Sequence, residues 1–179
     1  IDFNNDIVDS LKKFGTDAIS IHTKKNNIIK VTPEAKELGF VGIPNKVDNN
    51  LIEKILNQKQ VPIISPLGLG SDNHPYNING DTAAGAIAKS LKSRRLLLMT
   101  NVEGVLDKNK KLVNEISSSE ILKMIEDNTI TEGMIPKINT SLDAVNNGVK
   151  AVGIIDGRKK HSILFEIFSD KGSGTLIRK

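Results

Sequence analysis

Arg95-Leu-Leu-Leu-Met-Thr100 is the stretch that decides the fold class. A continuous apolar run of this kind is typical of a parallel strand that is covered on both faces. Apolar periodicity predicts helices on both sides of it in the sequence, over Thr82 to Leu91 and over Ser117 to Ile125. Ser117 and Glu120 resemble a capping box at the start of the second helix. The alternation of strands and helices predicts a layered α/β fold with a mostly parallel sheet.

The rest of the chain carries the same two kinds of pattern. Helical spacing predicts further helices over Asp2 to Lys13, Asn49 to Asn57 after an Asp48 cap, Pro136 to Asn146, and Ser162 to Phe168. Alternating or continuous apolar runs predict strands over 18–22, 28–31, 40–47, 61–65, 151–155 and 175–177. We expect the first two of these strands to form a hairpin across the polar turn 24–27.

Composition excludes several classes of protein. The 179 residues fit one large domain or a piece of a larger protein, and the absence of Cys excludes disulfide scaffolds and cysteine-based sites. The three His are far apart in sequence, so we expect no resident metal. The net charge of +4, with 3% aromatic residues, carries no nucleic-acid signature. No apolar run reaches membrane length and no signal peptide opens the chain, so we expect a cytoplasmic protein.

Ligands of open α/β sheets collect beyond the carboxyl ends of strands. Three predicted loops meet that condition: Gly68 to Asp81, Asn101 to Asp107 and Asp156 to Arg158. In the first loop, alternation puts Asn77 and Asn79 on one side of the chain, and Asp81 stands at the start of a helix. This pattern fits a polar ligand site, and it equally fits an ordinary helix N-cap.

Lys137 ends the loop Thr131-Glu-Gly-Met-Ile-Pro-Lys137, which leads into a predicted helix. Pro136 suits the first helical turn. A lysine here stands against the helix dipole, which is electrostatically unfavourable. Lys137 therefore either serves an anion or extends its ammonium group to solvent.

Five motifs occur in the order and spacing of a known family. They are Tyr76-Asn-Ile-Asn-Gly-Asp-Thr-Ala-Ala-Gly85, Leu98-Met-Thr-Asn-Val-Glu-Gly-Val-Leu-Asp107, Gly133-Met-Ile-Pro-Lys137, Ile154-Ile-Asp-Gly-Arg158 and Phe165-Glu-Ile-Phe-Ser-Asp-Lys-Gly-Ser-Gly-Thr175. Together they resemble the N-acetylglutamate kinases of the amino-acid kinase family. The resemblance implies a three-layer αβα sandwich with a mostly parallel central sheet, in which residues 1–66 belong to the acceptor lobe and residues 67–179 to the ATP lobe.

The implied reaction is phosphoryl transfer from MgATP to the side-chain carboxylate of N-acetyl-L-glutamate, the second step of arginine biosynthesis. Asn77 would bind the acetylglutamate beside Asn79, and Asp81 would organise the active-site lysines without acting as a base. Lys137 would stabilise the transferring charge. The ATP site would be lined by Asn101, Val102, Glu103, Gly104, Val105, Leu106, Ile130, Thr131 and Gly133. A carboxylate nucleophile is ionised at pH 7, so catalysis rests on positioning, charge neutralisation and Mg²⁺.

The end of the chain resembles the arginine-sensing region of feedback-inhibited family members. His161, Glu166, Gly172 and Gly174 match that pattern. A carboxylate such as Glu166 is a suitable partner for the guanidinium group of an L-arginine effector. The alternative is that Glu166 is a surface helix residue and the two glycines belong to a plain loop.

The chain departs from the family pattern in two respects. Asn101 stands where family members usually have Asp, which removes one charge near the nucleotide. The chain begins at Ile1, and the family's first lysine, glycine-rich loop and substrate-clamping arginine have no counterpart in it. We therefore expect an N-terminally truncated fold that is inactive alone, within an active, homo-oligomeric parent. The alternatives are a non-catalytic nucleotide- or arginine-binding regulatory domain, and a kinase for another acceptor such as carbamate or aspartate.

Overall fold

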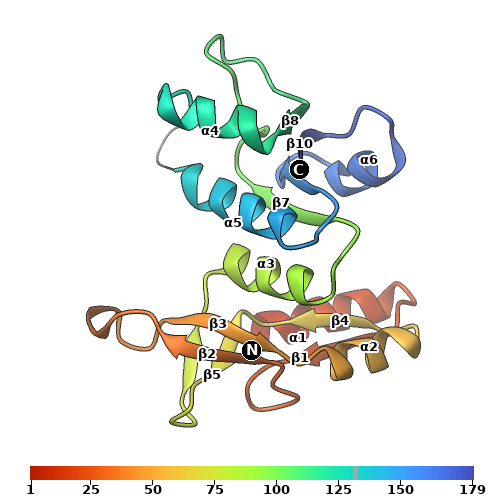
Figure 1. The fold of residues 1–179 in the computed structure, drawn as a ribbon. Helices are drawn as coiled ribbons and strands as arrows, with labels where there is room; N and C mark the ends of the chain where they lie inside the picture. Colours follow the sequence, from red (N-terminus) through yellow and green to blue (C-terminus); the bar gives the residue numbers. More distant parts are fainter. Residues whose placement is uncertain (131–132) are drawn as a thin grey trace. The chain divides into compact units, whose positions relative to one another are not determined.

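The computed structural model describes residues 1–130 and 133–179, which form two compact units, Ile1–Ile87 and Ala88–Lys179 (Figure 1). Both units combine helices with strands, as the sequence predicts. Among the described residues, four of the seven strand pairs are parallel and three are antiparallel. The lobe boundary expected at residue 67 falls inside the first unit and stays a prediction. No helix in the described ranges is long and apolar enough to cross a bilayer.

The first unit carries two sheets, with strand orders β1-β4 and β3-β2-β5-β6. Its elements are α1 (Asp2–Lys13), β1 (Ala18–Ile21), β2 (Ile29–Pro33), the 3₁₀ turn η1 (Lys36–Leu38), β3 (Gly42–Val47), α2 (Asn49–Asn57), β4 (Val61–Ile64), β5 (Leu67–Leu69) and β6 (Pro75–Asn77). Helix α3 (Gly80–Ser90) runs across the boundary between the units. The bounds of α1 and α2 agree with the prediction, and Asp48 caps α2 by accepting the N–H of Asn50.

The predicted hairpin between the first two strands is wrong. β1 pairs in parallel with β4, and β2 pairs with β3 and β5 instead. The turn after β1 closes with a single bridge between His22 and Lys25 and does not extend into a ladder. β1 and β4 are held together from α1, because the buried Asn4 amide donates to Ile63 O at 3.0 Å and accepts the Ser20 hydroxyl at 2.7 Å.

The predicted loop 68–81 contains two short strands, β5 and β6. Gly68 lies in β5 so close to its neighbour strand that an added Cβ would be 2.3 Å from Val31 Cγ1. A glycine that reads as a turn residue in the sequence is therefore a packing requirement within the sheet.

The second unit is built on one sheet with strand order β7-β9-β10-β8. Its elements are β7 (Leu96–Thr100), β8 (Glu115–Ser117), α4 (Ser118–Glu126), α5 (Ile135–Asn146), β9 (Val152–Asp156), α6 (Ser162–Phe168) and β10 (Gly174–Arg178). Every residue of β9 is buried, and both α5 and α6 pack against it. The capping box of α4 is confirmed, since Ser117 and Glu120 exchange both hydrogen bonds. β7 pairs in parallel with β9, so their carboxyl ends lie side by side.

A substitution at Gly174 tests the close packing of β10 against β9, because an added Cβ would lie 2.0 Å from the backbone oxygen of Ile154 on β9. Backbone cannot move aside as a flexible side chain can. We expect Gly174→Ala to lower the free energy of unfolding by at least about 2 kcal/mol. Urea unfolding followed by circular dichroism measures the change.

Gly80→Ala is the matched control, since its added Cβ would meet no atom within 4 Å apart from its chain neighbours and the backbone of its own helix. This control should leave the urea midpoint close to that of the unchanged chain. Equal midpoints for the two variants would contradict the close approach of β9 and β10.

Candidate functional site

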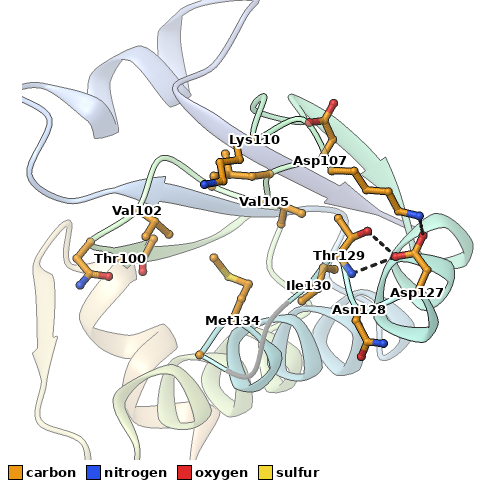
Figure 2. Close-up of a pocket in the computed structure, with 15 residues that line it drawn as sticks. Thr100, Val102, Val105, Asp107, Lys110, Asp127, Asn128, Thr129, Ile130 and Met134 are labelled. Carbon is orange, nitrogen blue, oxygen red and sulfur yellow. Dashed lines mark hydrogen bonds and ion pairs between the residues drawn. The ribbon is translucent and has the colours of Figure 1, made fainter.

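A pocket of about 790 Å³ opens at the carboxyl end of β7 in the second unit (Figure 2). One wall is the segment that follows β7, from Thr100 to Lys110. The facing wall comes from residues 127–130, which follow α4, and from Gly133 and Met134, which precede α5. The position agrees with the rule that ligands of α/β sheets bind beyond the carboxyl ends of parallel strands.

The wall after β7 is fastened to β10. The N–H of Val105 donates to the Thr175 hydroxyl at 2.8 Å, and both residues are buried. Gly104 precedes this contact with a φ of +148°, and an added Cβ would lie 2.6 Å from the same hydroxyl oxygen. Only glycine combines that backbone angle with so close an approach. The segment is therefore a fixed wall rather than a free loop.

Asp107 builds the turn that ends this wall. Its carboxylate accepts the N–H groups of Asn109 at 2.8 Å and Lys111 at 2.9 Å, and its own N–H donates to Lys111 O. Such a carboxylate substitutes for backbone partners and rigidifies the turn. The turn fixes where Lys108 and Lys110, which both line the pocket, leave the backbone.

Asp127 holds the facing wall. Its carboxylate accepts the N–H of Thr129 at 3.0 Å and the Thr129 hydroxyl, and it pairs with Lys108 Nζ at 2.9 Å (Figure 2). The hydrogen bond from the Thr129 side chain, followed by that from Lys108, lowers the pKa of Asp127 below its ordinary value. The Lys108–Asp127 pair therefore connects the two walls while the carboxylate is ionised.

Seven of the predicted ATP-site residues line this pocket. They are Asn101, Val102, Gly104, Val105, Leu106, Ile130 and Gly133. Glu103 does not line it, and Thr131 lies outside the described residues. The sequence interpretation missed Lys108, Lys110, Asp127 and Met134, whose place in the wall depends on a hairpin and a helix end rather than on a strand.

Lys137 stands in the first turn of α5, two residues after Ile135 begins that helix. Its ammonium group donates to the backbone oxygen of Met99 at 3.3 Å. Met99 is the residue before Thr100, which ends β7 and lines the pocket. Within the second unit, Lys137 therefore lies at the same strand end as the pocket.

Asn77, Asn79 and Asp81 belong to the first unit. Asn77 lies in β6, and its N–H donates to Phe40 O at 2.8 Å. Asn79 caps α3, since its side-chain oxygen accepts the N–H groups of Asp81 at 3.0 Å and Thr82 at 3.2 Å. Asp81 lies in the first turn of α3 without being its cap. The N-cap interpretation of this loop is therefore confirmed for Asn79, and the ligand site stays a prediction.

Asp156 lies at the same edge of the sheet as the pocket, because it ends β9 and pairs with Thr100 at the end of β7. Arg158 donates to this buried carboxylate through its N–H, Nε and Nη2, at 2.9, 3.0 and 2.9 Å. These hydrogen bonds lower the pKa of Asp156 below its ordinary value. The N–H of Gly157 donates to Thr100 O at 2.8 Å, so this turn supports the pocket edge.

A second, smaller pocket of about 270 Å³ contains three of the four predicted arginine-site residues: Glu166, Gly172 and Gly174. His161 stands at the N-terminal end of α6 and does not line it. Glu166 is only 5% exposed, so its alternative reading as a surface residue is wrong. Its carboxylate accepts the Ser173 N–H at 2.9 Å and faces Arg95 Nη1 at 3.6 Å, an ion pair beyond hydrogen-bond length.

The described part of the chain contains no group of three or more His, Asp or Glu side chains that could hold a metal ion by themselves. In phosphoryl-transfer sites, Mg²⁺ is commonly bound by one or two carboxylates together with the phosphates of the substrate. The pocket offers the carboxylates of Asp107 and Asp127, each already engaged within the protein. These residues fit a Mg²⁺ that arrives with a nucleotide.

Comparisons with known proteins agree with the predicted resemblance. The protein-family model described as "Amino acid kinase family" matches residues 1–156. An acetylglutamate kinase from Pelagibacter ubique (strain HTCC1062) is 53% identical over 179 residues, which are 100% of this chain and 62% of that protein. An acetylglutamate kinase from Jannaschia sp. (strain CCS1) is 44% identical over 175 residues, 98% of this chain and 61% of that protein. The chain thus spans less than two thirds of the length of either relative.

Solved structures agree in fold. The structure of smu.665 from Streptococcus mutans UA159 has a TM-score of 0.79 at 31% identity. The match covers 95% of this chain and 64% of the smu.665 chain. Carbamate kinase from Giardia lamblia bound to AMP-PNP has a TM-score of 0.71 at 17% identity. The match covers 98% of this chain and 67% of the carbamate kinase chain. The predicted α/β fold class, with its mostly parallel strands, is confirmed.

The Asp156–Arg158 pair predicts a pH dependence of stability. The pKa of Asp156 is lowered in the folded chain from its ordinary value of 3.8, so the pair stabilises the fold above that value and loses its effect as the pH falls through the folded pKa. Arg158→Met should therefore have a lower urea midpoint than the unchanged chain at pH 7. The difference between the two midpoints should become smaller as the pH is lowered to 3.

Arg94→Met is the control for the lost charge, since Arg94 is an exposed arginine of the same unit. It should shift the midpoint little at either pH. An Arg158→Met difference that stays the same from pH 7 to pH 3 would contradict the assigned pair.

Proposed function

This chain belongs to the amino acid kinase family, and we propose that the whole protein transfers the γ-phosphoryl group of ATP to the side-chain carboxylate of N-acetyl-L-glutamate. The observation that carries the proposal is the pocket after β7, whose walls combine Asn101 to Leu106 with Ile130 and Gly133. The 53% identity to an acetylglutamate kinase supports this acceptor over carbamate or aspartate. We further propose a cytoplasmic location and a homo-oligomeric assembly for the whole protein.

The pocket suits a nucleotide because its lining combines apolar side chains with polar and charged ones. Val105 and Ile130 are buried, and Met134 lies beside them in the wall (Figure 2). Such side chains accommodate the faces of a base, while backbone groups of the fixed segment 101–106 supply hydrogen bonds. The hydrogen bond from the Val105 N–H to the Thr175 hydroxyl supports this assignment, because it holds the segment in place before any ligand arrives.

The residues of the first unit would serve the acceptor. We assign to Asn77 the binding of acetylglutamate through its side-chain amide. Asp81 would orient a lysine ammonium group rather than remove a proton, since the acceptor carboxylate is already ionised. The capping hydrogen bonds of Asn79 support a positioning role, because they fix the backbone of Asp81 at the start of α3.

The proposed step is a single displacement at phosphorus. A carboxylate oxygen of acetylglutamate forms a bond to the γ-phosphorus of ATP, and the bond to the bridging oxygen of ADP breaks. The bridging oxygen keeps its electron pair, so no proton is transferred. Bound Mg²⁺ would neutralise phosphate charge. Lys137 would stabilise the charge on the transferring group, a role supported by its ammonium group lying at the carboxyl end of β7.

The smaller pocket favours a second, regulatory function, the binding of L-arginine. Glu166 is a buried carboxylate with Gly172 and Gly174 beside it. Buried carboxylates bind guanidinium groups strongly when the geometry allows two hydrogen bonds. A regulatory domain that binds nucleotide or arginine without catalysis stays the alternative to the kinase.

Assay of acetylglutamyl phosphate formation by the whole protein, trapped with hydroxylamine, tests the proposed reaction. Lys137→Met should lower kcat about 100-fold, the size of the loss when one charge-stabilising group is removed. Asn77→Ala should raise KM for acetylglutamate about tenfold, the cost of one lost polar contact. The exposed Lys150 provides a matched control, and Lys150→Met should leave both constants unchanged.

Three outcomes would count against this function. Turnover of carbamate or aspartate without turnover of acetylglutamate would change the acceptor. Nucleotide binding without phosphorylation of any acceptor would favour the non-catalytic domain. Unchanged kcat in Lys137→Met would remove the role given to that lysine. The same assay on the 179 residues alone tests the expectation that they are inactive.

Calorimetry with L-arginine tests the regulatory site on the chain itself. We expect binding heat with L-arginine and none with L-citrulline, which has the same shape but lacks the guanidinium charge. Glu166→Ala should abolish the heat, because it removes the buried carboxylate that lines the pocket. No heat from the folded chain would end the arginine proposal while leaving the kinase proposal intact.

A further inference from the structure

The hairpin after β7 sends two lysines into the nucleotide pocket, and the structure gives them different surroundings. Lys108 Nζ pairs with Asp127 at 2.9 Å and so belongs to the contact between the two walls. Lys110 leaves the same turn in the opposite direction. Figure 2 shows its side chain running along the pocket toward Val102, away from Asp127.

The backbone fixes the point from which the Lys110 side chain starts. Lys110 has a φ of 59°, in the left-handed region, and its N–H donates to Asp107 O at 2.9 Å. The Asp107 carboxylate holds the residues on either side of Lys110 through their N–H groups. The turn therefore fixes where the Lys110 side chain leaves the backbone, and from that point the side chain lines the pocket.

Among the described residues that line the pocket, Lys110 carries a positive charge that no carboxylate offsets. Asp127 is paired with Lys108, and the Asp107 carboxylate is engaged by backbone N–H groups of its own turn. Asn101 contributes an uncharged amide to the lining. Within residues 1–130 and 133–179, the Lys110 ammonium group forms no ion pair, although it points into a pocket. An ammonium group offers three donors, which suit the oxygens of a phosphate.

We propose that Lys110 binds the phosphate chain of the nucleotide, as a binding residue separate from Lys137. This assignment rests on the proposed function of the pocket as the ATP site. Lys110 sets affinity for the charged end of the ligand, and Lys108 keeps the wall in shape. The proposal predicts that the contribution of Lys110 requires phosphate groups on the ligand and is absent for the nucleoside.

Calorimetric titration of the 179-residue chain with adenosine, MgADP and MgATP tests this assignment. Lys110→Met should weaken binding of MgADP and MgATP about two- to fivefold, the range of one exposed charge contact, and leave adenosine binding unchanged. The loss should shrink at high salt because the charges are screened. Lys110→Arg should retain affinity, and Lys111→Met, an exposed neighbour outside the pocket lining, should match the unchanged chain.

The outcomes separate this inference from the proposed function. An equal loss of affinity for adenosine and MgADP would overturn the phosphate role of Lys110. Unchanged MgADP binding in Lys110→Met would also overturn it, while the pocket would remain a nucleotide site. If the unchanged chain binds none of the three ligands, the function proposed for the pocket falls, and the assignment of Lys110 falls with it.

Discussion

The hydrogen bond from the Val105 N–H to the Thr175 hydroxyl is the constraint on which the candidate site depends. It joins the segment after β7 to β10, a strand 70 residues further along the chain, in a region that excludes water. An unpaired donor buried there would be costly, so the contact fixes both partners. Gly104 allows the approach because a Cβ would collide with the same hydroxyl. A segment that would otherwise be a mobile loop becomes a preformed wall.

The opposite wall is held by weaker and more exposed interactions. Asp127 binds Thr129 and Lys108 at the surface, where solvent screens the charges. The pocket therefore has one rigid wall and one that can adjust. This division suits the proposed function, in which a nucleotide is bound and a product with one phosphate fewer is released. Lys137 approaches the rigid side, through the backbone of β7.

Local features of the sequence predicted local features of the structure. The ends of α1 and α2 and the capping box at Ser117 depend on neighbouring residues and are confirmed. The pairing of strands could not be predicted in the same way. β1 pairs with β4, supported by the buried amide of Asn4, and not with the strand after the adjacent turn. For the site, the family resemblance pointed to residues on both walls, such as Gly104 and Ile130, whereas Asp127 reaches the pocket only through the fold. The sequence left Asn79 undecided between ligand and cap, and its hydrogen bonds give it the cap.

Backbone amide NMR of the chain titrated with MgADP tests the central claim most directly, that the fixed segment after β7 is a nucleotide wall. The account predicts that the largest chemical-shift changes fall within residues 100–106, 127–130 and 133–134, with a change at Thr175 transmitted through its hydrogen bond to Val105. Saturable shifts confined to other parts of the second unit, with residues 100–106 unmoved, would contradict it.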